Sequence, residues 1–263
     1  MCLILFAYEM HEQYPLIIAA NRDEYFHRPT ARAHFWDDEP HILAGRDLEK
    51  MGTWMGVTKS GRFSFVTNYR DPLEKTEGKK SRGELVRNAL NFSGNLEDFF
   101  RDIKQNADRY PGFNLVAGEL GEIYYFSNRE GEIKKLTKGI YGLSNHLLDT
   151  PWPKVTTGKR GLKKIIEEKQ HNLIEKLFLL LENREVYPDE ELPETGVSLE
   201  MERMLSPLFI TGKNYGTRSS TVLLMTESEV LFTERVKQPV PDIDKKYYFQ
   251  YKRNTNPKEK QTN

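Results

Sequence analysis

Cys2 is the residue of this 263-residue chain whose position by itself suggests chemistry, because it directly follows the initial methionine. Removal of Met1 would leave Cys2 with both a thiol and a free α-amino group. The ordinary pKa of an α-amino group is about 7.7–8.0 and that of a thiol is about 8.5, so one residue can supply both base and nucleophile near neutral pH. The alternative is a packing role, since a free cysteine is most often a small buried hydrophobe.

A cysteine that attacks an amide needs partners, and polar segments at the ends of predicted strands hold the required types. It needs a positive group that favours the thiolate, a carboxylate that holds the α-ammonium group, and amide donors for the oxyanion. The segments are Asn21-Arg22-Asp23-Glu24, Val66-Thr67-Asn68-Tyr69, Gly142-Leu143-Ser144-Asn145 and Tyr215-Gly216-Thr217-Arg218-Ser219-Ser220. An asparagine at a strand end is equally typical of a turn, so both roles stay open for each asparagine.

The amino-acid composition excludes several classes of function. The 39 Lys and Arg residues balance the 39 Asp and Glu residues, which argues against a nucleic-acid-binding protein that works through a large basic field. A single cysteine excludes an internal disulfide and a multi-cysteine zinc site, and the 6 histidines show no metal-ligand spacing. The common nucleotide-binding, serine-hydrolase and zinc-protease motifs are absent. We therefore expect no cofactor, no metal and no nucleic-acid partner.

The apolar N-terminal run does not have the pattern of a secretory signal peptide. No basic residue precedes Cys2–Tyr8, and no small-residue cleavage site follows it. No stretch approaches the ~18 uncharged residues that a membrane-spanning helix needs. We therefore expect a cytoplasmic protein without an integral membrane segment. The sequence does not indicate its oligomeric state.

Pairs of apolar runs joined by short turns predict antiparallel β-sheets. The pairs are 2–8 with 16–20, 53–59 with 62–69 through Ser60-Gly61, and 215–226 with 229–236. Further strands are predicted at 113–118, 123–126, 140–143 and 247–251. Helices are predicted from a capping box at Ser81 through residue 90, and at 96–109, 159–170 and 173–183.

These elements come in blocks of strands and blocks of helices, without the regular alternation of a parallel α/β sheet. The blocks predict an α+β protein with mostly antiparallel sheets and with helices on their outer faces. We expect one domain over residues 1–251. The polar segment 252–263 is predicted to be a disordered tail.

A series of short motifs, in order from residue 2 to about residue 235, supports a family assignment. They are Cys2, Ala19-Ala20-Asn21-Arg22-Asp23-Glu24, Arg28-Pro29, Gly52-Thr53-Trp54-Met55-Gly56, Thr67-Asn68-Tyr69, Arg82-Gly83-Glu84-Leu85, Gly112-Phe113-Asn114-Leu115, Tyr141-Gly142-Leu143-Ser144-Asn145, Thr150-Pro151-Trp152-Pro153-Lys154 and Tyr215-Gly216-Thr217-Arg218. Together they resemble the NRDE family, which is named for its Asn-Arg-Asp-Glu motif. This family includes the transport and Golgi organization protein 2 homologues.

The NRDE family is similar in layout to the N-terminal-nucleophile hydrolases, especially the penicillin V acylase and bile salt hydrolase group. That group shares a four-layer αββα sandwich and an N-terminal cysteine, so the resemblance implies both here. By this resemblance Cys2 is the catalytic nucleophile and Asp23 is the carboxylate that holds its amino group. Asn68 and Asn145 resemble the asparagines beside the oxyanion and substrate, and Arg218 resembles a late-strand arginine of the site.

One departure from the acylase pattern concerns the group that activates the thiol. The acylases carry an arginine three residues before the aspartate, whereas this chain has Ala20 there and has Arg22 next to Asp23. Neighbouring strand residues point to opposite faces, so Arg22 and Asp23 share one site only if the strand has ended or bulged. Arg22 stays a candidate for thiol activation, and Asn21 and Tyr69 are candidates for substrate binding.

Two functional hypotheses follow. The first is a cysteine amidohydrolase that acts on a small linear or cyclic amide through an acyl-enzyme on Cys2. The second is a non-catalytic binding or trafficking protein that retains the hydrolase scaffold and carries a hydrophobic or acyl-bearing ligand. A purely structural protein is the third alternative. The first two predict a small-molecule partner.

Overall fold

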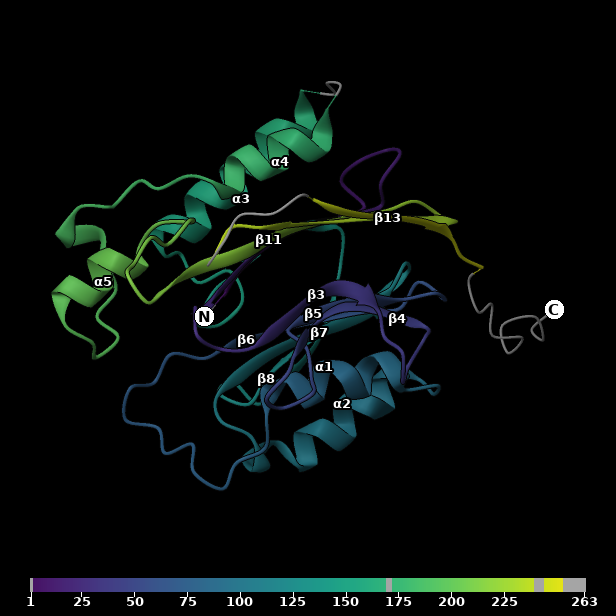
Figure 1. Cartoon of the computed structure of the whole chain (residues 1–263), viewed down its shortest axis with the longest axis horizontal. Helices are drawn as coiled ribbons and strands as arrows, with labels where there is room; N and C mark the ends of the chain where they lie inside the picture. The colour runs from purple at the N-terminus through teal and green to yellow at the C-terminus, as the bar shows by residue number, and fades with distance from the viewer. Residues whose placement is uncertain (1, 169–171, 239–243, 253–263) are drawn as a thin grey trace.

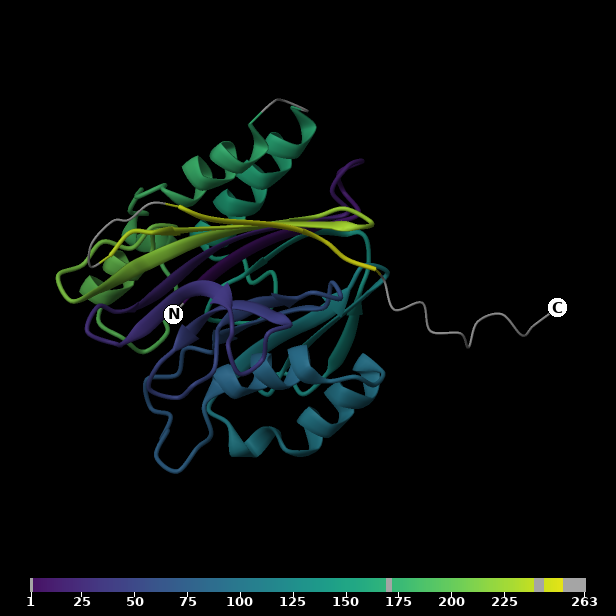
Figure 2. The ribbon, with the colours of Figure 1, turned by 45° about the vertical axis from the view of Figure 1, so that its right-hand side comes forward.

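Two antiparallel β-sheets stack face to face, and helices cover the outer face of each (Figure 1). This arrangement is seen in a computed structural model that describes residues 2–168, 172–238 and 244–252. The four layers remain separate when the molecule is turned (Figure 2). The α+β class and the αββα sandwich expected from the sequence are thereby confirmed.

The first sheet holds the N-terminal strand second from one edge. Its spatial order is β10 (Gly139–Leu143), β1 (Cys2–Tyr8), β2 (Leu16–Tyr25), β11 (Tyr215–Met225), β12 (Glu229–Val236) and β13 (Lys245–Gln250). Helices α3 (Pro153–Glu167) and α4 (Leu173–Leu181) cover its outer face, and α5 (Leu199–Leu205) follows them. Every strand pair in this sheet is antiparallel.

The second sheet is a meander in which neighbouring strands follow one another along the chain. Its order is β3 (Thr30–Phe35), β4 (Ile42–Asp47), β5 (Met55–Thr58), β6 (Phe63–Asn68), β7 (Phe113–Glu119), β8 (Glu122–Ser127) and β9 (Ile133–Leu136). Helices α1 (Arg82–Asn91) and α2 (Leu96–Gln105) cover its outer face (Figure 1). The Ser81 side chain accepts a hydrogen bond from Gly83 N and so caps α1, as the sequence predicts.

Strand β1 is apolar throughout because both of its faces are buried. Ile4 and Phe6 point into the core between the two sheets, whereas Leu3 and Leu5 point toward the helices. Helix α3 lies so close to this strand that a Cβ atom on Gly158 would stand 2.7 Å from a Leu5 methyl group. Glycine at 158 therefore permits the close packing of α3 on β1.

Several elements differ from the sequence-based expectations. Strand β2 continues to Tyr25 and does not end at residue 20, because its polar residues pair with β11 on one side and with β1 on the other. Strands β3, β4 and β9 and helix α5 are not among the predicted elements, and α3 begins at Pro153. The end of the predicted helix 159–170 and the tail from 253 onward lie outside the described residues.

Candidate functional site

Cys2 lies at the open end of β1, where a hollow of about 410 Å³ reaches it. The thiol-bearing residue is 9% exposed. The hollow is also lined by residues from β2, from β6 and from the first turn of α1, among them Arg22, Asp23, Asn68 and Arg82. Four of the candidate site residues, Cys2, Arg22, Asp23 and Asn68, therefore meet at one surface.

The register of β1 and β2 decides which neighbour the thiol faces. Cys2 stands directly opposite Arg22 in the antiparallel ladder, and opposite residues of such a pair share a face. Asp23 follows Arg22 within a strand that continues to Tyr25, so its side chain points to the other face, toward the helices. The irregularity lies in β11, between Thr217 and Ser219. Arg22 and Asp23 thus approach the end of β1 from opposite faces.

Arg22 is held against an aromatic ring. Its guanidinium carbon lies 4.0 Å from the centre of a Trp54 ring, and Nη1 donates to Thr30 Oγ1 at 3.3 Å. Trp54 in turn packs over β4, where a Cβ atom on Gly45 would be 2.3 Å from the ring. Trp54 therefore both packs on β4 and supports Arg22. The Arg22 guanidinium is therefore held on the same face of the sheet as the Cys2 thiol.

The ionisation of Cys2 reflects competing influences. Burial raises the pKa of the Cys2 thiol, and the charge of Asp23 raises it further. The charge of Arg22 and a hydrogen bond from the backbone amide of Asp23 lower it. The thiol thus needs positive charge nearby in order to ionise near neutral pH.

Asp23 is buried on the helix side of β2. Its Oδ1 accepts a hydrogen bond from Thr217 Oγ1 at 2.7 Å, and the same hydroxyl accepts one from Ile210 N at 2.9 Å. Burial raises the pKa of the Asp23 carboxyl, while the charge of Lys154 lowers it. The carboxylate is thus oriented by the Thr217 hydroxyl of β11.

Asn145 joins the site through the backbone. Its Nδ2 donates to the carbonyl oxygen of Asn68 at 3.0 Å, and the neighbouring Ser144 hydroxyl donates to Cys2 O at 3.3 Å. Its own carbonyl oxygen accepts a hydrogen bond from Arg70 N at 2.7 Å. The two asparagines expected near the oxyanion are therefore adjacent to each other, beside the nucleophile's strand.

Besides Asn145, three further candidates do not line the hollow, contrary to the sequence-based expectation. Asn21 points to the helix layer, where its Nδ2 donates to Leu181 O and Leu208 O, each at 2.8 Å. Tyr69 alternates away from Asn68, and its hydroxyl pairs with His146 Nε2 at 2.7 Å. Arg218 donates to the carbonyl oxygens of Tyr25 and Arg28 and so holds the turn after β2.

Asn21→Ala is expected to lower the free energy of unfolding by roughly 2–5 kcal/mol. The two carbonyl oxygens and the Ser220 hydroxyl that bind this amide would lose a buried partner, and each unsatisfied group costs about 1–3 kcal/mol. Urea unfolding measures the loss, with Asn106→Ala on the exposed end of α2 as the matched control. A loss below 1 kcal/mol would contradict the structural role assigned to Asn21.

A buried charged cluster beside the site is absent from the sequence-based candidates. Arg70 and Glu202 form an ion pair at 2.7 Å with both side chains buried, and the Arg70 guanidinium lies 4.9 Å from the centre of a Trp152 ring. Lys154, also buried, occupies the first turn of α3. A lysine in the first turn opposes the helix dipole, and this mismatch is a sequence feature that could have drawn attention to Lys154.

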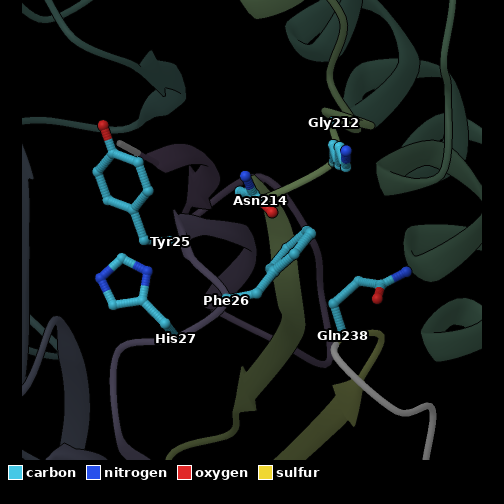
Figure 3. Close-up of a pocket in the computed structure, with 7 residues that line it drawn as sticks. Tyr25, Phe26, His27, Gly212, Asn214 and Gln238 are labelled. Carbon is cyan, nitrogen blue, oxygen red and sulfur yellow. The ribbon is translucent and has the colours of Figure 1, made fainter.

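A second hollow of about 580 Å³ lies beyond Tyr25 and is lined by Phe26, His27, Gly212, Asn214 and others (Figure 3). Tyr25 borders both hollows. None of the candidate catalytic residues lines the second one, so the smaller hollow at Cys2 is the candidate active site. Over 2–168, 172–238 and 244–252, no three metal-binding side chains converge, and no helix is long and apolar enough to cross a membrane.

The fold and site together define an αββα sandwich protein whose first strand begins at a cysteine. Residues 1–239 match the family Transport and Golgi organisation 2, and the chain belongs to this family. Homologues of transport and Golgi organization protein 2 are 35% identical in Homo sapiens over 257 residues and 33% identical in Mus musculus over 260 residues. Each alignment covers 89% of this chain and 92% of the relative. The family resemblance seen in the motifs is confirmed.

Two solved structures also align with most of this chain. A mutant conjugated bile acid hydrolase from Clostridium perfringens aligns with a TM-score of 0.49 at 8% identity, covering 97% of both chains. A Caenorhabditis elegans orthologue of N-acylethanolamine-hydrolyzing acid amidase aligns with a TM-score of 0.46 at 10% identity, covering 85% of this chain and 92% of the other.

Proposed function

We propose that this protein is a cysteine amidohydrolase of the N-terminal-nucleophile type, acting on a small linear or cyclic amide. The observation that carries the proposal is the arrangement around Cys2. Arg22 shares the face of the thiol, and Asp23 approaches the same strand end from the opposite face. One group suits the thiolate and the other suits an ammonium group, which are the two charges that an N-terminal cysteine develops.

The reaction begins after Met1 is removed and the amino group of Cys2 is free. That amino group takes the proton of the thiol, and Sγ attacks the carbonyl carbon of the amide. Asn68 and Asn145 are the proposed donors to the oxyanion, and Asp23 holds the α-ammonium group. Collapse of the intermediate breaks the C–N bond, and the leaving amine takes the proton from the α-ammonium group. The α-amino group of Cys2 then takes a proton from water, which attacks the thioester. The acyl group leaves as a carboxylic acid, and the α-ammonium group returns its proton to the thiolate.

The test combines mass spectrometry with a substrate screen on the full chain. The intact mass of the purified protein reports whether Met1 is removed. The protein is then incubated with a panel of N-acyl amides and lactams, and quenching with acid traps any acyl adduct on Cys2. We expect amine release and a trapped adduct with the natural chain and neither with Cys2→Ala. The exposed substitution Asp189→Asn, which removes a surface ion pair with Arg203, serves as the control.

Other outcomes of the same screen overturn the proposal. Retention of Met1 in preparations that hydrolyse amides would exclude the amino group as the base. Hydrolysis that continues in Cys2→Ala would exclude the nucleophile. A hydrophobic or acyl-bearing compound that is bound unchanged by both proteins would favour the binding or trafficking function.

A further inference from the structure

The second hollow borders the candidate active site and has no part in the reaction described above. Its volume of about 580 Å³ lies within the range of small-molecule sites, which is roughly 300–1,000 Å³. Tyr25, the last residue of β2, lines both this hollow and the hollow at Cys2. A group bound in the second hollow would therefore lie next to whatever occupies the first.

Aromatic rings from three consecutive residues, Tyr25, Phe26 and His27, line the second hollow (Figure 3). Tyr25 is 53% exposed, yet other rings contact its ring. The ring centre lies 5.1 Å from that of Tyr215, edge to face, and 5.5 Å from that of His27. A ring held in this way offers apolar surface and loses little conformational freedom when a ligand binds.

The polar side chains of the second hollow narrow the chemistry of its ligand. Lys213, Asn214 and Gln238 line it together with the aromatic rings. Aromatic rings can bind a cation, but the positive charge of Lys213 disfavours one here. A lysine only donates hydrogen bonds, and the side-chain amides can also donate them. A neutral aromatic ring that carries a hydrogen-bond acceptor fits this combination.

Strand β2 sets the distance between the nucleophile and this ligand. Cys2 stands opposite Arg22 in the ladder, and Tyr25 is three residues further along the same strand. Three residues of an extended strand span about 10 Å. A ligand that reaches both hollows therefore carries its ring on a spacer of several methylene groups from the scissile carbonyl.

We propose that the second hollow is a distal subsite for the aromatic ring of an extended amide substrate, and that Tyr25 is the residue that determines this specificity. The inference rests on the proposed function in that the amide is cleaved at Cys2. Both the acyl part and the amine part extend from the scissile bond, so either can carry the ring. The shared chemistry is an aryl group separated from the carbonyl by a flexible spacer.

The experiment compares aryl amides with cyclohexyl amides of the same length. The first aryl probe, N-butyl 6-(4-methoxyphenyl)hexanamide, carries the ring on the acyl side. The second, N-[4-(4-methoxyphenyl)butyl]acetamide, carries it on the amine side. In each counterpart a 4-methoxycyclohexyl group replaces the aryl ring. The value of kcat/KM is measured for turnover, and isothermal titration with a Cys2→Ala background measures the dissociation constant without turnover.

The variants test whether the ring of Tyr25 is responsible. Tyr25→Leu removes the ring, and Tyr25→Phe keeps it. Tyr248→Leu is the matched control, because Tyr248 is a 61% exposed tyrosine on β13 and is not among the described residues that line either hollow. Side chains this exposed can be replaced with little risk to folding.

We expect the natural chain to prefer the aryl amide over its cyclohexyl counterpart about three- to tenfold in kcat/KM, because an aromatic pair contributes roughly that factor. The arm that shows the preference identifies the side of the amide that carries the ring. Tyr25→Leu should reduce the preference below twofold, whereas Tyr25→Phe and Tyr248→Leu should keep it. The dissociation constants should show the same ratios. A spacer of one methylene group should abolish the preference, because its ring cannot reach the second hollow.

Four results would overturn the inference. They are equal values for aryl and cyclohexyl amides in both arms, a preference that persists in Tyr25→Leu, an equal loss in Tyr248→Leu, and a preference that does not depend on spacer length. Binding of aryl amides that depends on Tyr25, without cleavage, would contradict the proposed function while supporting the subsite. Cleavage without an aryl preference would do the reverse. If these amides are neither bound nor cleaved, both proposals fail.

Discussion

Asp23→Asn is expected to lower Cys2-dependent amide hydrolysis by two to four orders of magnitude while the protein stays folded. The substitution keeps an oxygen that can accept the Thr217 hydrogen bond, so the local packing is preserved. It removes the negative charge that holds the α-ammonium group of Cys2 in the proposed reaction. The α-amino group that acts as the general base then loses its positioning partner, and a positioned general base ordinarily contributes about 10²–10⁴ in rate.

The pH dependence gives this prediction a second readout. The carboxylate is the form that binds an ammonium group, and burial raises the pKa of Asp23 above its ordinary value of 3.8. Hydrolysis by the natural chain should therefore fall as the pH drops through that raised pKa, and Asp23→Asn should lack this acidic limb. Initial rates between pH 4 and pH 9 measure both effects, with thermal unfolding as the check on folding. A loss of less than tenfold would remove Asp23 from the mechanism.

Glu202→Gln is expected to lower the free energy of unfolding by about 3–5 kcal/mol, because it leaves Arg70 charged and buried without its counter-ion. Glu202 Oε2 binds Arg70 Nη1 at 2.7 Å, and Oε1 accepts hydrogen bonds from the backbone N and the hydroxyl of Thr195. Arg70 N also binds the carbonyl oxygen of Asn145. The ion pair thus fastens α5 to the strand ends that carry the candidate site.

A double-mutant cycle separates the pair from its surroundings. Arg70→Met should cost a similar 3–5 kcal/mol, because it leaves the Glu202 carboxylate buried. The double variant Arg70→Met with Glu202→Leu should recover a large part of the loss, since no uncompensated charge remains. Urea unfolding of the four proteins measures the coupling. Strictly additive losses of unfolding free energy would show that the two residues do not act as a pair. The surface ion pair of Arg101 with Glu97, measured by the same cycle, gives the reference for a weak coupling.

Local patterns predicted most of the elements that build this fold. The apolar run of β1, the Ser60-Gly61 turn and the Ser81 cap each rely on residues within a few positions of one another, and all three appear as expected. Strands β3 and β4 are not among the predicted elements because their sequences mix arginine, histidine and glycine with apolar residues. Their burial comes from contacts with the opposite sheet and with Trp54, which local periodicity does not contain.

The candidate site, like the fold, could be predicted from local patterns only in part. The alternation rule correctly stated that Arg22 and Asp23 point to opposite faces of a continuous strand, and motif resemblance selected Cys2, Asp23, Asn68 and Asn145. The sequence also suggested Asn21 and Arg218, although Asn21 binds the helix layer and Arg218 braces a turn. Residue type does not distinguish a substrate contact from a buried hydrogen bond, because both use the same donors.

By itself, then, the sequence determined that a cysteine begins the first strand, that the sheets are antiparallel and that the chain has no second thiol. Only the tertiary structure decided that β2 continues past its apolar run, that Trp54 supports Arg22, and that Arg70 and Glu202 form a buried ion pair. The physical reason is the separation along the chain over which each effect acts. Side-chain periodicity is set by backbone geometry over a few residues, whereas the charge balance of a buried site depends on groups that only the packing of α3, β2 and β11 brings together.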